Sequence, residues 1–330
     1  NRHERPARAT TACYDIRAAP SWRLERAAMR ADQPAMPALE GTIARWAAAR
    51  PDVQALVVVG SYARTDSPAD PWSDLDLVLF ADDPTPYLES TGWLDAIAPP
   101  RITFTEPTAL GIGRERRVLF EGGLDVDFTL VPATWLDALD PEHGDQALRA
   151  AVAPVVARGY RILIDRDGRL SRVLTGLKGA SPPSPPLPSP EEMDELIQDF
   201  WYHAVWTARK LRRGELWVAL RCCDGYMKTL LLRMLEWDAH ARDPHVDTWH
   251  EGRFLERWAD PRTLSHLRSA FSRYDESAVW LALMNTMDLF RGVAGDTCAR
   301  LGYTYPTEVD RYASRLVEQL ARPQGRQSIG

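Results

Sequence analysis

Two aspartates lie two positions apart inside an apolar run, in the sequence SDLDLVLF of residues 73–80. Side chains two positions apart on a strand point to the same face, so Asp74 and Asp76 would present two carboxylates side by side. Such a pair repels unless a proton or a cation neutralises it. Carboxylate oxygens are ligands that Mg²⁺ prefers, and phosphoryl-type transfer commonly uses two such ions. The spacing therefore predicts a magnesium site.

A third carboxylate follows in the sequence GLDVDFTL of residues 123–130. Asp125 and Asp127 again share one strand face, so either of them could join the first pair. Three carboxylates on adjacent strands would complete a site for two magnesium ions.

The apolar run before the first pair ends in Gly60 and Ser61, followed by a short polar loop. Glycine lets the backbone approach a ligand closely, and free N–H groups at the start of the SYAR turn can hold phosphate oxygens. Ser61 adds a hydroxyl, and Arg64 could neutralise phosphate charge. Taken singly, the Gly-Ser step is typical of an ordinary turn and the aspartate pair of a solvated strand edge. The combination favours a catalytic metal site over a degenerate or structural remnant.

The sequence patterns around these side chains predict a mixture of strands and helices. A helix is predicted where apolar residues recur at helical spacing, and strands where β-branched and apolar residues run together. The helix is expected at residues 36–50, before a Pro-Asp step, strands at 53–60, 73–80 and 160–165, and a hairpin across Gly122 and Gly123 at 116–132. The mixture predicts an α+β domain around a mixed sheet.

A proline-rich segment, SPPSPPLPSP at residues 181–190, divides the chain. It can continue neither a helix nor a central strand, so we expect an extended linker. Residues 191–330 are helical in pattern and hold seven of the twelve tryptophans, which predicts a helical-bundle domain. The expected organisation is an N-terminal extension over 1–35, the α+β domain over 36–180, the linker and the bundle.

The composition of the chain limits the classes of binding partner that we expect. The formal net charge of −6 does not indicate a nucleic-acid-binding surface. No apolar run approaches the roughly 20 residues that span a bilayer, and the N-terminal residues lack the apolar core of a secretory signal. We expect a cytoplasmic monomer that acts on small molecules.

The segment GSYAR followed by SDLDL resembles the signature of nucleotidyltransferases with the polymerase-β-type fold. The segments DFWYHAVWTARKLRRGELWVAL, LLLRMLEWDAH and LGYTYP resemble the aminoglycoside 6-adenylyltransferases, which modify streptomycin. The resemblance covers roughly residues 40 to 320. It implies an antibiotic-resistance enzyme that transfers AMP from ATP to a streptomycin hydroxyl, releases pyrophosphate and uses Mg²⁺. It also implies that Asp74 and Asp76 bind metal, and that Asp127 rather than Asp125 is the third carboxylate, acting as general base or metal ligand.

The helical half offers further candidates. The chain has only three lysines, and Lys210 and Lys228 lie in the segments that carry the resemblance, which makes them candidates for triphosphate binding. Aromatic rings could stack on adenine or cover the antibiotic, and carboxylates could bind guanidinium groups. Candidate substrate-binding residues are Asp199, Trp201, Tyr202, Glu215 and Trp237. Core tryptophans and solvated helix-surface charges are the structural alternatives.

Two other functional hypotheses stay open at this point. The enzyme could modify a different acceptor, such as another antibiotic or a protein hydroxyl. Alternatively, the chain could be a nucleotide-binding module without turnover.

Overall fold

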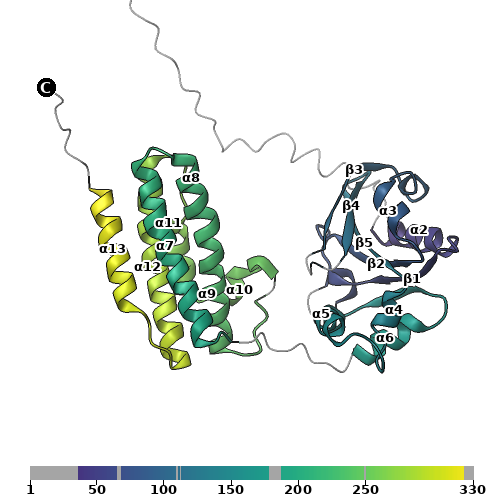
Figure 1. Cartoon of the computed structure of the whole chain (residues 1–330). Coiled ribbons are helices and arrows are strands. Elements are labelled where there is room, and N and C mark those ends of the chain that lie inside the picture. The colour runs from purple at the N-terminus through teal and green to yellow at the C-terminus, as the bar shows by residue number, and fades with distance from the viewer. Residues whose placement is uncertain are drawn as a thin grey trace, which may run out of the picture. The chain divides into compact units, whose positions relative to one another are not determined.

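The computed structural model describes residues 36–64, 68–108, 111, 113–177, 187–248 and 250–322. The chain forms two compact units, which divide between Pro182 and Pro183 (Figure 1). The N-terminal extension at 1–35 and residues 181–186 of the expected linker lie outside the described residues.

The first unit contains a six-stranded sheet with the strand order β3-β4-β5-β2-β1-β6 in the part of the chain that is described. Its strands are β1 (Val53–Val58), β2 (Leu75–Ala81), β3 (Pro100–Pro107), β4 (Arg114–Phe120), β5 (Leu124–Pro132) and β6 (Arg161–Asp165). β2 and β5 are parallel, whereas the other neighbouring pairs are antiparallel. The predicted mixed sheet is thereby confirmed.

Helices cover both faces of this sheet. They are α2 (Met36–Ala48), α3 (Thr85–Glu89), α4 (Trp135–Ala138), α5 (Gln146–Ala157) and α6 (Arg169–Leu177), with 3₁₀ turns η1 (Gly60–Ala63) and η2 (Leu94–Ala96). One apolar layer joins α2 and α3 to one face, and a second layer joins α4, α5 and α6 to the other.

The alternation of β2 decides which face carries the aspartates. Leu75, Leu77 and Leu79 are at most 1% exposed and belong to the layer under α2 and α3. Asp76 alternates with these leucines and so points to the opposite face, the one that α4, α5 and α6 cover in part. Three buried leucines therefore anchor the strand and fix the direction of the carboxylate.

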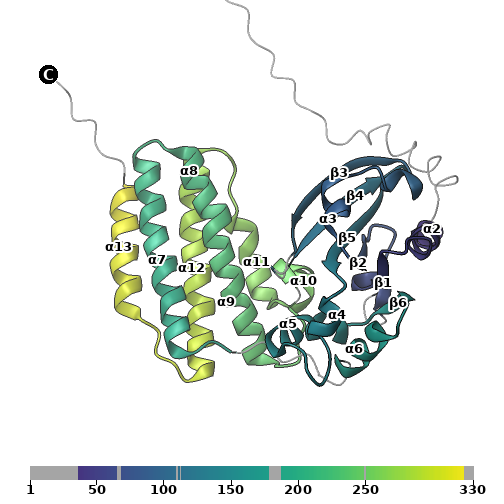
Figure 2. The same ribbon diagram turned by 45° about the vertical axis from the view of Figure 1, so that its right-hand side comes forward.

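The second unit is helical, as predicted. Its helices are α7 (Pro190–Arg212), α8 (Leu216–Arg221), α9 (Met227–Arg242), α10 (Leu255–Trp258), α11 (Pro261–Ala270), α12 (Glu276–Leu301) and α13 (Thr307–Ala321). A π-helical turn η3 (Cys222–Tyr226) joins α8 to α9, and a 3₁₀ turn η4 (His250–Gly252) precedes α10. The four long helices α7, α9, α12 and α13 lie side by side as a bundle (Figure 2).

Side chains at the N-terminus of α7 cap the helix. The Ser189 side chain accepts a hydrogen bond from the Glu192 N–H, and the Glu192 carboxylate accepts one from the Ser189 N–H. This reciprocal capping box satisfies two backbone donors at a helix end. The buried face of the helix then packs into an aromatic core, where the Phe200 ring stacks on the Phe290 ring of α12.

None of the helices in the described part of the chain combines the length and the apolarity that a membrane span requires. The cytoplasmic location and the monomeric state stay predictions.

Candidate active site

Three carboxylates meet where β2 and β5 run in parallel. Asp76 on β2 is the register partner of Asp127 on β5, and Asp74 lies one residue before β2. One carboxylate oxygen from each of the three lies within 4.8 Å of the others. Asp125 shares the strand face but lies outside this cluster. The parallel pairing thus brings Asp127, and not Asp125, beside the first pair.

The guanidinium group of Arg117 compensates part of the negative charge of this cluster. Arg117 on β4 is the register partner of Asp127 and donates to both of its carboxylate oxygens, with the Nε–Oδ1 distance 2.8 Å. The same side chain lies 3.5 Å from an Asp74 oxygen and 3.4 Å from a Glu106 oxygen. Its hydrogen bond to Asp127 raises the pKa of Arg117, so the positive charge is permanent. Three carboxylate oxygens this close together fit the donor set of a divalent metal.

The backbone at Gly60 also points to a ligand. Gly60 has φ +64°, and a Cβ atom at this position would overlap the carboxylate of Asp76. Only glycine lets β1 turn into η1 this close to the aspartate. The Ser61 hydroxyl that follows is buried and finds no hydrogen-bond partner among the described residues. An orphaned hydroxyl beside a carboxylate cluster fits a missing phosphate oxygen.

Sequence reasoning missed Glu115, which lies on the same face of the sheet as Arg117. Burial, reinforced by the negative charge of Asp127, raises the pKa of Glu115 to about 7. Together with Asp76 and Thr129, Glu115 lines a cavity of about 250 Å³ whose other walls are mostly valine and leucine. The site therefore holds an acidic group that titrates near neutral pH beside the carboxylate cluster.

The raised pKa predicts a dependence of stability on pH. Because the folded-state value lies above the ordinary 4.5, the folded protein binds more protons than the unfolded chain between those values. The stabilising contribution is fully present below pH 4.5 and is lost as the pH rises through 7. We expect Glu115→Gln to gain thermal stability relative to the wild type between pH 5.5 and pH 8.5, measured by circular dichroism melting.

The matched control for this prediction is Glu89→Gln, because Glu89 is an exposed carboxylate at the end of α3. Its melting temperature should follow that of the wild type at both pH values. Parallel melting curves for Glu115→Gln and the wild type across this range would contradict the assignment.

The helical-unit candidates do not form one site. Trp201 and Trp237 are 1% and 8% exposed and belong to the core, whereas Tyr202 is 65% exposed. Glu215 pairs with Lys210 at 2.8 Å. Asp199 accepts a hydrogen bond from a tyrosine hydroxyl of the π turn. Trp201 and Tyr202, which are neighbours in the chain, line one cavity of about 240 Å³, and the roles of all five substrate candidates stay predictions.

The two lysines differ in surroundings. The Lys210 ammonium lies 5.0 Å from the centre of the Trp206 ring and is partly exposed. The Lys228 ammonium is buried and donates to the Cys223 carbonyl at 3.0 Å and the Thr286 hydroxyl at 2.8 Å. Burial lowers the pKa of Lys228. Protein acceptors already engage Lys228, whereas Lys210 lies nearer the surface.

Comparison with known proteins identifies the family. The family model described as streptomycin adenylyltransferase matches residues 33–320, which is most of the chain. The chain belongs to this family. The resemblance noted in the sequence is thereby confirmed, and so is the prediction that the protein is a nucleotidyltransferase. A streptomycin adenylyltransferase family member takes its adenylyl group from ATP.

Two curated relatives carry the name aminoglycoside 6-adenylyltransferase. The one from Campylobacter jejuni is 21% identical over 281 residues, covering 81% of this chain and 89% of the relative. The one from Bacillus subtilis is 23% identical over 268 residues, covering 77% of this chain and 87% of the relative.

Two solved structures are similar to the chain. An aminoglycoside 6-adenyltransferase from Bacillus subtilis aligns with a TM-score of 0.42 and 16% identity, covering 88% of this chain and 100% of that one. A nucleotidyltransferase-like protein from Exiguobacterium sibiricum aligns with a TM-score of 0.31 and 15% identity, covering 89% and 96%.

Proposed function

We propose that the protein transfers AMP from ATP to a hydroxyl group of streptomycin, releases pyrophosphate and so inactivates the antibiotic. The observation that carries this proposal is the cluster of Asp74, Asp76 and Asp127, set in register across two parallel strands. The family match and the names of the two curated relatives support an aminoglycoside as the acceptor.

The three carboxylates would hold Mg²⁺, for which we propose two ions. Bound there, Mg²⁺ supplies charge neutralisation for the phosphates and polarisation of their oxygens. Asp76 is held in direction by its strand, and Asp127 by the two hydrogen bonds from Arg117. Rigid donors of this kind position a ligand without reorganisation during the reaction.

The chain's other groups hold the phosphates and move the proton. The Ser61 hydroxyl donates to a phosphate oxygen, and the glycine at position 60 leaves room for it. Arg64, which is buried, adds positive charge. The acceptor oxygen forms a bond to the α-phosphorus while the bond from this phosphorus to pyrophosphate breaks. The hydroxyl proton passes to Asp127, one of the three clustered carboxylates.

Pyrophosphate release from the purified protein with Mg²⁺ and ATP tests the proposal, with streptomycin and a panel of other aminoglycosides as acceptors. We expect release that depends on streptomycin, and a product in which phosphorus–proton coupling identifies the modified hydroxyl. Release with another aminoglycoside and none with streptomycin would assign a different acceptor. Measurable ATP binding with no release for any acceptor would contradict turnover.

A further inference from the structure

The cavity of about 250 Å³ in the first unit extends from the edge of the carboxylate cluster into an apolar layer. One wall is the carboxylate face of the sheet, and α4, α5 and α6 form the other (Figure 1). Apart from four polar side chains, its described lining is apolar and mostly valine and leucine. Phosphates and polyhydroxylated sugars would lose their hydrogen bonds to water against such walls, so the interior favours a hydrocarbon.

Three of the four polar lining residues lie near one another in the register of the sheet. Thr129 on β5 is the register partner of both Glu115 on β4 and Val78 on β2. Asp76 precedes Val78 by two residues on the same strand face, and Phe80 continues the apolar lining in the other direction. The cavity is therefore amphipathic, with carboxyl groups at one end and hydrocarbon beyond them.

Glu115 at this end has no cationic partner. Its side chain is half-buried, and its hydrogen-bonding neighbour is another carboxyl group, that of its register partner Glu106 on β3. None of the basic side chains in the described ranges forms an ion pair with Glu115. Arg117, two positions along β4, pairs instead with Asp127, Asp74 and Glu106. A carboxyl group beside apolar walls suits a cation that brings its own hydrocarbon.

We propose that this cavity binds a small amphiphilic amine, with a phenyl-sized hydrocarbon body among the valines and its ammonium group hydrogen-bonded to the Glu115 carboxylate and the Thr129 hydroxyl. Apolar cavities of about 150 Å³ already admit a benzene ring, so the larger volume leaves room for a short arm between ring and ammonium. A primary ammonium group has three donors, which are enough for both side chains.

An amine bound in this way opposes metal binding. Its charge lies at the end of the cavity that Asp76 also lines, and repulsion between two cations at such a partly buried site lowers an affinity about tenfold. Because coupling between two ligands is reciprocal, the metal weakens the amine by the same factor. This coupling rests on the proposed function, which places the metal at the cluster, whereas the amine site does not.

Isothermal titration of the full chain without divalent metal, at pH 8.0, tests the site with phenethylamine, phenethyl alcohol and ethylamine. We expect phenethylamine to bind, and ethylamine to bind at least about tenfold more weakly because it lacks the ring. Glu115→Gln should weaken phenethylamine about tenfold and leave phenethyl alcohol unchanged. Val156→Phe, at a buried position of the wall, should weaken both aromatic ligands at least about tenfold, because the added ring fills the cavity.

The controls are Glu89→Gln and Val218→Phe, which make the same replacements at exposed positions outside the cavity. Both should bind phenethylamine like the wild type. No phenethylamine binding by the wild type would overturn the inference. So would an unchanged phenethylamine affinity in Glu115→Gln, or an equal loss of amine and alcohol in that variant, because the ammonium would then not lie at Glu115.

Paramagnetic resonance of Mn²⁺ tests the coupling. Phenethylamine should lower the Mn²⁺ affinity of the wild type about tenfold, and phenethyl alcohol should leave it unchanged. An Mn²⁺ affinity that is indifferent to the amine would refute the coupling. Absence of Mn²⁺ binding without any amine would contradict the metal site of the proposed function, while the titration in metal-free buffer would still decide whether the amine site exists.

Discussion

Replacement of Asp76 by Asn is expected to lower the rate of pyrophosphate release at least about a thousandfold, because one of three clustered oxygen ligands loses its charge. The fold should persist, since the leucines on either side of Asp76 stay buried and the substitution removes a repulsion with Asp74 and Asp127. The assay is steady-state release of pyrophosphate, with Mn²⁺ binding followed by paramagnetic resonance as a second measure. Mn²⁺ affinity should fall with the rate.

Asp82→Asn is the matched control for this variant. Asp82 follows β2 directly, is exposed and pairs with Gln54 rather than with the cluster. Its rate and its Mn²⁺ affinity should equal those of the wild type. Full activity in Asp76→Asn, or a variant that has lost its circular dichroism spectrum, would refute the role assigned to Asp76.

Replacement of Gly60 by Ala is expected to reduce the rate about a hundredfold although it replaces no charged residue. The added methyl group would overlap the carboxylate of Asp76, and displacement of a reacting or ligating group by about 1 Å costs on this order. The positive φ of this residue adds backbone strain of about 1 kcal/mol to the cost. The measurements are pyrophosphate release and the melting temperature.

Gly123→Ala separates these two effects. Gly123, in the hairpin between β4 and β5, has φ +77°, and a Cβ atom there would meet no heavy atom within 4 Å. This variant carries the backbone strain without the collision, so it should melt at a lower temperature than the wild type and retain its rate. Equal rate losses in Gly60→Ala and Gly123→Ala would show that strain alone, and not the position of Asp76, limits activity.

Much of the first unit follows from patterns that the sequence displays locally. The alternation in SDLDLVLF predicts three buried leucines and a pair of carboxylates on the other face, and the structure shows this arrangement. The parallel pairing of β2 with β5 has no such local signal, because it joins segments about fifty residues apart. The strand β3 also escaped prediction, since half of its residues are polar and none is buried.

Glu115 and Arg117 were missed, although the hairpin contained the signal. Turn geometry fixes the register of a hairpin, and the register of β4 with β5 pairs Arg117 with Asp127. Counting back from the two glycines would have placed both side chains on the carboxylate face. The raised pKa of Glu115, in contrast, depends on burial beside Asp127, which no spacing in the sequence reveals.

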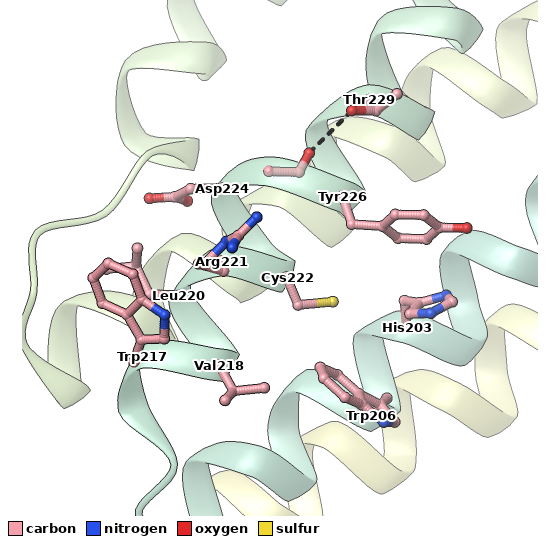
Figure 3. Close-up of a pocket in the computed structure, with 11 residues that line it drawn as sticks. His203, Trp206, Trp217, Val218, Leu220, Arg221, Cys222, Asp224, Tyr226 and Thr229 are labelled. Carbon is pink, nitrogen blue, oxygen red and sulfur yellow. Dashed lines mark hydrogen bonds between the residues drawn. The ribbon is translucent and has the colours of Figure 1, made fainter.

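In the second unit the helical period distinguishes tryptophans of the core from those outside it. Trp201 shares one face of α7 with Ile197, Ala204 and Ala208, and all four residues are buried. The indole N–H of Trp201 donates to the Tyr305 hydroxyl. Trp206 lies outside this buried face of α7 and lines a cavity between α7 and α8 (Figure 3). Trp217 could not be assigned in this way, because α8 has only six residues before the π turn changes the period.

The contact between Arg117 and Asp127 has a consequence for how the enzyme is made. A newly synthesised chain carries its own counter-charge for the acidic cluster, so the first unit can complete its sheet before it meets any ion from the cell. The proposed metal would replace the guanidinium as the partner of Asp127, and its affinity would be lowered by the work of separating Asp127 from Arg117. If the cluster binds Mg²⁺ as proposed, the fold would form without the ion and only the reaction would require it.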